Sequence, residues 1–153
     1  MICEFTLAFT TSVCASFISD NQTVPMKNIQ LDSCIKVAQE SEAQGIDPSL
    51  SMAVAWIESR FITKRKSNKG AIGVMQILPK YWCPNKRNCN SIKFGIKALG
   101  FLLNRSSEKN ALCQYASGKV CKKRTARYRY MKTVLKKRSV ISNIMTRLCG
   151  DGC

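Results

Sequence analysis

Apolar residues recur at helical spacing along most of this sequence, and this pattern predicts a mainly helical fold. The clearest segment, 48–61, begins with Asp47 at the N-cap and Pro48 at the first helical position. Its apolar residues follow at intervals of four, three and four: Leu50, Val54, Ile57 and Phe61. The same reasoning predicts helices over 31–43 (capped by Asp32 or Ser33), 91–104, 108–116, 123–138 and a short stretch ending at Gly150. Residues 67–77 contain two glycines and predict a loop or a short hairpin, so we expect a small all-α domain with one glycine-rich interruption.

The first 30 residues do not follow this pattern. Residues 2–18 are mostly apolar, and Val13-Cys14-Ala15 has the small residues of a signal-peptide cleavage site. No Lys or Arg precedes the apolar run and Glu4 lies inside it, so a buried N-terminal segment is the alternative. We interpret 1–19 as a signal peptide or apolar segment, 20–30 as a linker, 31–140 as the folded domain and 141–153 as a cysteine-containing tail. No internal stretch is long and apolar enough to predict a membrane span.

The chain contains nine cysteines, which is many for a reduced cytosolic protein. Cys83 and Cys89 bracket a five-residue loop, and Cys113 and Cys121 bracket a seven-residue loop. Such short brackets favour local disulfides and an oxidising compartment. Free thiols and a zinc cluster are the alternatives, but the sequence has no CxxC pair and no histidine. Because the count is odd, at least one thiol lacks an intramolecular partner.

The absence of histidine also excludes several kinds of catalysis, including Ser-His-Asp hydrolysis, Cys-His proteases and His-ligated zinc enzymes. A carboxylate, lysine, tyrosine or cysteine must carry any chemistry. Charge is the second constraint: 25 Lys and Arg against 9 Asp and Glu give a formal net charge of +16. Basic residues cluster in 119–138 and in Lys64–Lys69, which favours a polyanionic partner such as nucleic acid, an anionic membrane or an acidic wall polymer. A solvated basic face is the alternative.

Between Asp47 and Glu108 the chain has a single acidic residue, Glu58, at the flank of the apolar stripe of 48–61. Most glycoside hydrolases place two carboxylates around the scissile bond. A lone Glu-Ser pair, then GAIGVMQI at 70–77, then Tyr115-Ala116-Ser117-Gly118, resembles the lytic transglycosylases with a lysozyme-like catalytic domain. The resemblance covers about residues 31–138 and implies a mainly α fold with a glycine-rich loop or short hairpin beside an active-site cleft. It is greatest to the short members carried by secretion or conjugation machines and by phages.

The resemblance implies a role for each matching residue. Glu58 would be the catalytic acid and base, with no metal or other cofactor. Substrate-binding positions would be Ser59, Gly73, Met75, Gln76, Tyr115, Gly118 and Tyr130, the last followed by Val134 and expected to hold the glutamate. Ala116 departs from the family pattern, which has an asparagine there. To act as an acid near neutral pH, Glu58 needs a raised pKa, at a cost of about 3–4 kcal/mol. We expect desolvation by Trp56, Ile57, Phe61, Met75 and Tyr115 to oppose the charges of Arg60 and Lys64.

The implied reaction cleaves the β-1,4 bond between MurNAc and GlcNAc in peptidoglycan and leaves a 1,6-anhydroMurNAc end. The nucleophile is the C6 hydroxyl of the substrate itself, so no second carboxylate is needed. The expected location is the periplasm or the cell exterior, or a virion for a phage protein. A hydrolytic muramidase is one alternative and would need Asp47 or Glu108 in the cleft. A non-catalytic binder of a polyanion or of the cell wall is another, although the basic run lacks a nucleic-acid-binding motif. Trp56 and Trp82 are candidates for stacking on sugar rings.

Overall fold

The computed structural model describes residues 6–150, and this part of the chain consists of helices joined by loops. The helices are α1 (Leu7–Asn21), α2 (Asn28–Ala43), α3 (Pro48–Ser59), α4 (Pro79–Trp82), α5 (Ser91–Leu103), α6 (Glu108–Ser117) and α7 (Ala126–Gly150). No strand forms within 6–150, where only isolated bridges pair Ile72 with Lys66 and with Ile77. The prediction of a mainly α fold is therefore confirmed. No helix in the described range has the length and apolar character needed to cross a membrane.

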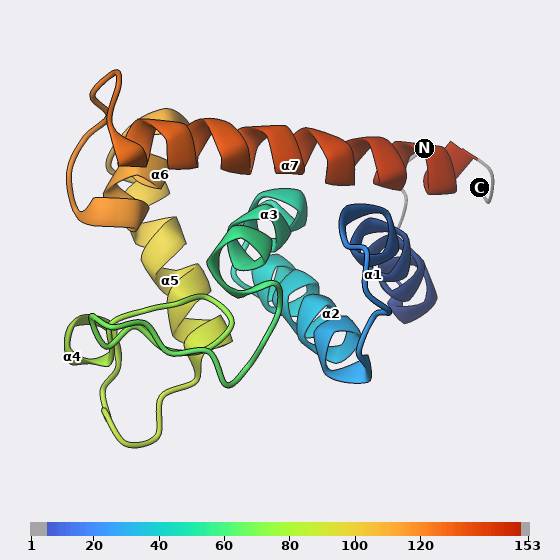
Figure 1. Cartoon of the computed structure of the whole chain (residues 1–153), viewed down its shortest axis with the longest axis horizontal. Coiled ribbons are helices and arrows are strands. Elements are labelled where there is room, and N and C mark those ends of the chain that lie inside the picture. Colours follow the sequence, from blue (N-terminus) through green and yellow to red (C-terminus); the bar gives the residue numbers. More distant parts are fainter. Residues whose placement is uncertain (1–5, 151–153) are drawn as a thin grey trace.

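The centre of the molecule is α3, which contacts both α2 and α7. Figure 1 shows α7 running along the whole upper side, with α1 to α3 below it and α4, α5 and α6 gathered toward one end. The sequence spacing predicted one buried stripe on α3, but Ser49 to Trp56 are buried on every side. A helix that is buried on all faces needs small or apolar residues on every side. Helix α3 has them, since between Ser49 and Trp56 it contains only Ser, Ala and larger apolar residues. Near its last turn α3 approaches the surface, at Ile57 and Glu58.

Several helix boundaries differ from the sequence predictions. The segment 123–138 and the tail were expected to form two helices, but α7 is continuous to Gly150 because no Gly or Pro interrupts 119–149. Its buried residues Met131, Val134, Ile141 and Ile144 keep helical spacing throughout. Helix α2 begins at Asn28 rather than near Asp32, because the side chain of Gln30 accepts a hydrogen bond from the backbone N–H of Lys27. The short helix α4 was not predicted.

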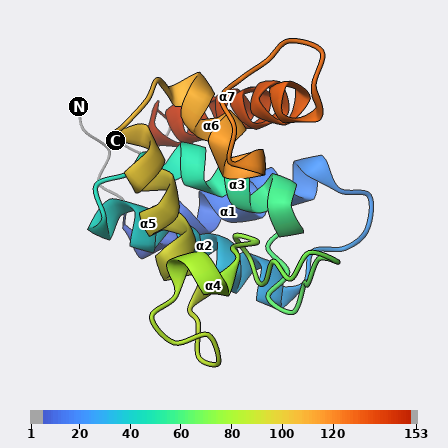
Figure 2. The ribbon, with the colours of Figure 1, turned by 90° about the vertical axis from the view of Figure 1, so that its left-hand side faces the viewer.

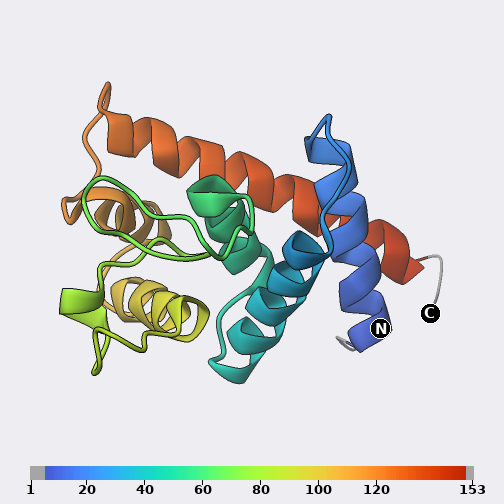
Figure 3. The ribbon, with the colours of Figure 1, turned by 60° about the horizontal axis from the view of Figure 1, so that its bottom comes forward.

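The N-terminal helix α1 is part of the hydrophobic core. Phe17 is fully buried and packs edge-on against the rings of Trp56 and Phe61. A disulfide joins Cys14 of α1 to Cys34 of α2, and Figure 3 shows α1 crossing close to both α2 and α7. In the structure α1 is a buried N-terminal segment, which was our alternative to a signal peptide. Cleavage near Ala15 would separate Cys14 from the rest of the chain, and whether it occurs in the cell stays a prediction.

The two disulfides expected from short brackets are present, Cys83–Cys89 and Cys113–Cys121. The first closes the loop between α4 and α5, and the second closes the connection between α6 and α7. Within residues 6–150 no group of three or more metal-ligating side chains forms. The cysteines in these brackets therefore secure loops next to helix ends.

Candidate active site

Glu58 lies in the last turn of α3, where the chain leaves the core. Directly after it the helix ends, since Arg60 and Phe61 both have positive φ, 56° and 60°. Two consecutive left-handed residues without glycine are unfavourable and need support from their surroundings. The side-chain amide of Gln30 donates to the carbonyl oxygen of Arg60 at 3.0 Å, and the Phe61 ring is fully buried. Glu58 therefore lies at a helix end whose backbone is held in place by Gln30 and by the buried Phe61 side chain.

Tyr130 of α7 contacts the Glu58 carboxyl group. Its hydroxyl donates a hydrogen bond to Oε1 of Glu58 at 2.7 Å. Burial raises the pKa of Glu58 to about 7, although the bond from Tyr130 and the positive charge of Arg65 both act to lower it. Burial, and then the nearby Glu58 charge, raise the pKa of Tyr115 and of Tyr130 well above 10, so both phenols stay protonated. A carboxyl group with a pKa near 7 can both donate and accept a proton at neutral pH.

The turn Gly73–Gln76 is fastened to α3 and α5 by two serines. The Ser59 hydroxyl donates to the carbonyl oxygen of Val74 at 2.7 Å, and Ser91 Oγ accepts from the backbone N–H of Met75 at 3.0 Å. Gly73 has a φ of +71°, and a Cβ there would lie 2.5 Å from the Ser91 side chain. Gln76 also has positive φ, and its side-chain amide donates to the carbonyl oxygens of Arg65 and Gly73. The glycine is needed for both its conformation and the close approach of α5.

The third contributor to the turn is α6. The Tyr115 hydroxyl donates to the carbonyl oxygen of Met75 at 2.8 Å. Gly95 of α5 lies against this contact, and a Cβ at that position would overlap the Met75 side chain. In Figure 2, α5 and α6 stand in front of α3, with the segment that follows α3 passing beside them. Residues from α3, α5 and α6 are therefore brought together around one turn.

Residues of α3, α4, α5 and α6 and of the loop before α4 line a groove of about 710 Å³ that contains Glu58. Of the residues expected to bind substrate, Gln76, Tyr115 and Gly118 line it. Ala116, which stands where the family has asparagine, lines it as well. Two aromatic residues at the same groove, Tyr81 and Trp82, belong to the unpredicted α4, and the Trp82 ring packs edge-on against Phe101. The groove thus combines a desolvated carboxyl group with aromatic and amide side chains.

Other sequence-predicted residues lie outside the groove. Ser59, Gly73 and Met75 are buried and support the turn, so they are placed to position the groove rather than to touch a ligand in it. Trp56 and Phe61 pack in the core against Phe17, so they do not form the predicted wall around Glu58. Because Trp56 is fully buried, the idea that it stacks on a sugar is wrong. Its position two residues before Glu58 puts it on another face of the helix.

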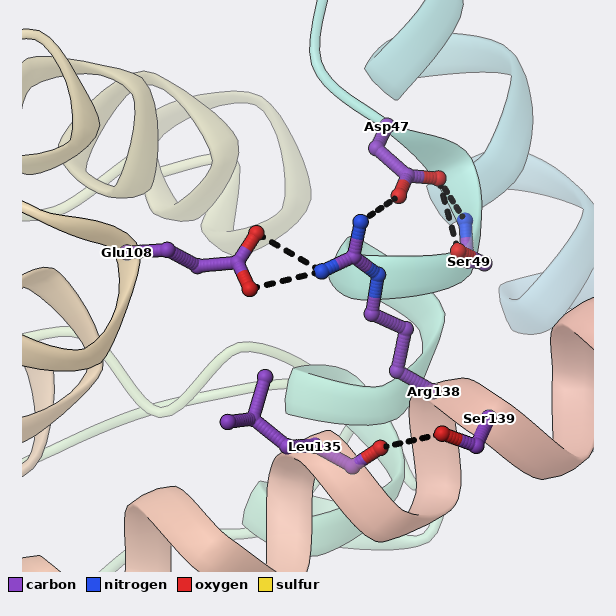
Figure 4. Close-up of polar contacts among 6 residues, drawn as sticks. All are labelled: Asp47, Ser49, Glu108, Leu135, Arg138 and Ser139. Atoms are coloured by element: carbon purple, nitrogen blue, oxygen red, sulfur yellow. Dashed lines mark hydrogen bonds and ion pairs between the residues drawn. The ribbon is translucent and has the colours of Figure 1, made fainter.

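The only other carboxylates considered for catalysis, Asp47 and Glu108, are engaged elsewhere. The guanidinium of Arg138 contacts Asp47 at 2.8 Å and Glu108 at 2.7 Å, between the starts of α3 and α6 (Figure 4). Asp47 also accepts hydrogen bonds from the N–H and hydroxyl of Ser49 as the helix cap. Asp47 lies eleven positions before Glu58, at the other end of α3 and about 16 Å away along the helix axis. Neither lines the groove.

Two functional contributors could not be found from the sequence. Ser91 is far from the turn in sequence and carries no motif, and only the packing of α5 shows that it holds Met75. The second contributor is Arg65, whose positive charge lowers the pKa of Glu58. From the sequence we expected Arg60 and Lys64 to have this effect, and nothing distinguished Arg65 from the other cations nearby. Arg60 instead stacks over the Trp56 ring at 4.5 Å.

Comparison with protein-family models identifies a transglycosylase SLT domain over residues 35–137. This match spans more than half of the chain, and the chain therefore belongs to that family. The family comprises peptidoglycan lytic transglycosylases, lyases that act on polysaccharide. The expected lysozyme-like fold, enzyme class and peptidoglycan substrate are confirmed at this level. No curated protein and no solved structure matches the chain.

Proposed function

We propose that this protein cleaves the β-1,4 bond between MurNAc and GlcNAc in peptidoglycan and leaves a 1,6-anhydroMurNAc end, with Glu58 as its only acid and base. The observation that carries the proposal is the isolation of Glu58 in the groove. Its carboxyl group is desolvated, bonded to Tyr130 and unaccompanied by a second carboxylate among the groove-lining residues.

In the proposed reaction Glu58 begins protonated and donates its proton to the glycosidic oxygen as the C1–O bond breaks. The carboxylate then takes the proton from the C6 hydroxyl of the same MurNAc, whose oxygen bonds to C1. Protons balance, since one leaves and one returns to Glu58, and no water is consumed. The attack is intramolecular, so the nucleophile is already positioned next to C1. A pKa of about 7 suits a group that must perform both steps.

Tyr130 supports this cycle by orienting the carboxyl group. Its hydroxyl bonds Oε1 in the structure, which leaves Oε2 as the oxygen available for proton transfer. Gln76 brings the end of the turn to the groove, and Gln76, Tyr81 and Trp82 are placed to contact sugars. Aromatic side chains suit sugar binding because their faces cover the apolar C–H groups of a ring.

Hydrolysis by an inverting route would require a second carboxylate to activate water. The ion pairs of Arg138 with Asp47 and Glu108 hold both candidates away from Glu58, which favours the anhydro product over hydrolysis.

The deciding experiment is mass spectrometry of the soluble products from purified peptidoglycan. We expect products that lack one water relative to hydrolysed muropeptides, and we expect the Glu58→Gln variant to release none. Glu42→Gln is the control, since that exposed carboxylate lies on α2 outside the groove and should keep activity. Products that contain the added water would assign a muramidase instead. Absence of products from the wild-type chain, with retained binding to peptidoglycan, would leave the binding protein.

We further propose that the protein works outside the cytoplasm, in the periplasm or beyond, or on a virion, and that a secretion, conjugation or phage machine recruits it. Three disulfides in the described residues support an oxidising compartment. The basic α7 and the loop before it suit attraction to the anionic wall.

A further inference from the structure

A second cavity, of about 500 Å³, lies beside the same turn but has no lining residue in common with the groove. Gly73 and Val74 line the second cavity, whereas Gln76 and Ile77 line the groove. The proposed reaction leaves this cavity without a role.

The side chains around this cavity carry an unusual concentration of positive charge. Five cationic residues line it, and no Asp or Glu does: Lys64, Arg65, Lys66, Lys86 and Arg87. Residues 59–107 contain no acidic residue at all. Within residues 6–150 the ion pairs are Lys36–Asp32 and those of Arg138, so none of them neutralises this cluster. The cluster, which we call the basic pocket, therefore has no acidic counterpart in the described part of the chain.

The fold brings this charge together from two separate segments. Lys64–Lys66 follow the end of α3, and Lys86 and Arg87 lie in the loop that the Cys83–Cys89 disulfide closes. The start of α5 contributes Asn90 and Ser91 to the same pocket. Holding like charges together costs free energy, and a bound anion would offset that cost. The helix start adds a further favourable field for an anion, but the five cations are the main feature.

We propose that the basic pocket binds a multiply charged oxyanion of the phosphate class, held between the Lys64–Lys66 segment and the loop with Lys86 and Arg87. Two arginines offer the paired N–H donors that suit phosphate oxygens, and the lysines add charge. With five cations, the pocket matches a multiply charged group better than a single carboxylate. The proposal stands apart from the reaction at Glu58, because binding can be measured without any turnover.

An anion in this pocket has a consequence for the groove. Arg65 lines the pocket, and its charge lowers the pKa of Glu58. A bound anion would offset that charge, so the pKa of Glu58 should rise when the pocket is occupied. The other groups that act on the Glu58 carboxyl are Tyr130 from α7 and Tyr115 from α6, and neither lies at the pocket. Arg65 is therefore the residue through which an anion in the basic pocket would change the pKa of Glu58.

The test is a titration with inorganic phosphate at constant ionic strength, followed by amide NMR shifts. We expect saturable shifts at Gly73, Val74, Asn90 and Ser91, and at least about tenfold weaker binding for Lys86→Ala/Arg87→Ala. The matched control is Lys122→Ala/Lys123→Ala, which removes two adjacent exposed cations from the loop before α7. Lys64→Ala/Lys66→Ala, on the opposite wall, should weaken binding as well. Thermal unfolding of each variant shows that its fold is retained.

A second arm uses poly(glycerol phosphate) to identify the source of the phosphate. Tighter binding of the polymer than of inorganic phosphate, lost in the same pocket variants, would assign the pocket to a polymer phosphodiester. Tighter binding of inorganic phosphate would assign it to a free phosphate. Equal losses in the pocket and control variants, or shifts spread along α7, would overturn the proposal, because they would show attraction to net charge alone.

Discussion

Glu58 is the residue at which stability and function conflict. The unfolded chain ionises this carboxyl group near its usual pKa of 4.5, whereas burial raises the folded pKa to about 7. Between these values the folded protein binds more protons than the unfolded one, so the free energy of unfolding falls as pH rises from about 4.5 to about 7. The full loss amounts to about 3 kcal/mol and persists above pH 7.

We expect Glu58→Gln to remove this loss, because glutamine is similar in shape and carries no charge. The variant should be more stable than the wild type by up to about 3 kcal/mol at pH 8 and about equal to it at pH 4. Urea unfolding of both proteins at pH 4, 6 and 8 measures the difference, in which the contributions of other groups cancel. A wild-type advantage that grows with pH would contradict the buried, proton-carrying state of Glu58.

Tyr130 acts on the same carboxyl group in the opposite direction. Its hydrogen bond stabilises the ionised form, so Tyr130→Phe should raise the pKa of Glu58 further. NMR titration of labelled glutamate side chains measures this pKa. Tyr128→Phe is the control, because Tyr128 lies two residues away on α7 and makes no hydrogen bond to Glu58. An unchanged or lower pKa in Tyr130→Phe would show that the bond does not hold the carboxylate.

At the scale of elements, the groove depends on how closely α5 approaches the turn. A Cβ on Gly95 would overlap Met75 and lie 3.3 Å from the Tyr115 hydroxyl oxygen. We expect Gly95→Ala to lower stability by about 1–3 kcal/mol, because crowding in a packed core outweighs the better helix propensity of alanine. Activity should fall too, since Tyr115 and Met75 would shift together. Thermal unfolding and a peptidoglycan-release assay measure the two effects.

Gly150→Ala is the matched control for this effect. It is also a glycine in a helix, but a Cβ there meets nothing within 4 Å. The substitution should leave the melting temperature unchanged or slightly raised. If Gly95→Ala behaves in the same way, the close approach of α5 is not needed.

At the scale of the whole molecule, α1 is attached to the core by both packing and a covalent bond. The Cys14–Cys34 disulfide joins residues twenty positions apart, and a loop of this length contributes about 3 kcal/mol in a chain-entropy model. Cys83–Cys89 spans only six positions and should contribute about 2 kcal/mol. We therefore expect Cys14→Ser/Cys34→Ser to lower the melting temperature more than Cys83→Ser/Cys89→Ser. An equal or smaller loss would show that the Cys14–Cys34 bond contributes less than its loop length predicts.

Local sequence was sufficient wherever a few neighbouring residues decide the structure. Asp47 and Pro48 mark the start of α3 because a side-chain cap and a fixed φ act within one turn. The brackets of Cys83–Cys89 and Cys113–Cys121 were recognisable because closing a short loop costs little conformational entropy, so the two thiols meet readily. Glu58 was recognised from its motif and from the lack of other acids nearby. Local reasoning ended α7 too early, because the burial of Ile141 and Ile144 against other helices supports its last turns.

The mainly helical class, the family, the single candidate acid and the strong positive charge could all be predicted from the order of the amino acids. These follow from residue types and spacings that need no knowledge of distant contacts. Packing between distant segments places α1 in the core, turns Trp56 toward Phe17 rather than the groove, and brings Arg138 to Asp47 and Glu108. The same packing brings Ser91 to the turn and places two basic segments at one pocket. Each of these depends on which faces of helices meet, and residues far apart in the chain settle that by packing together.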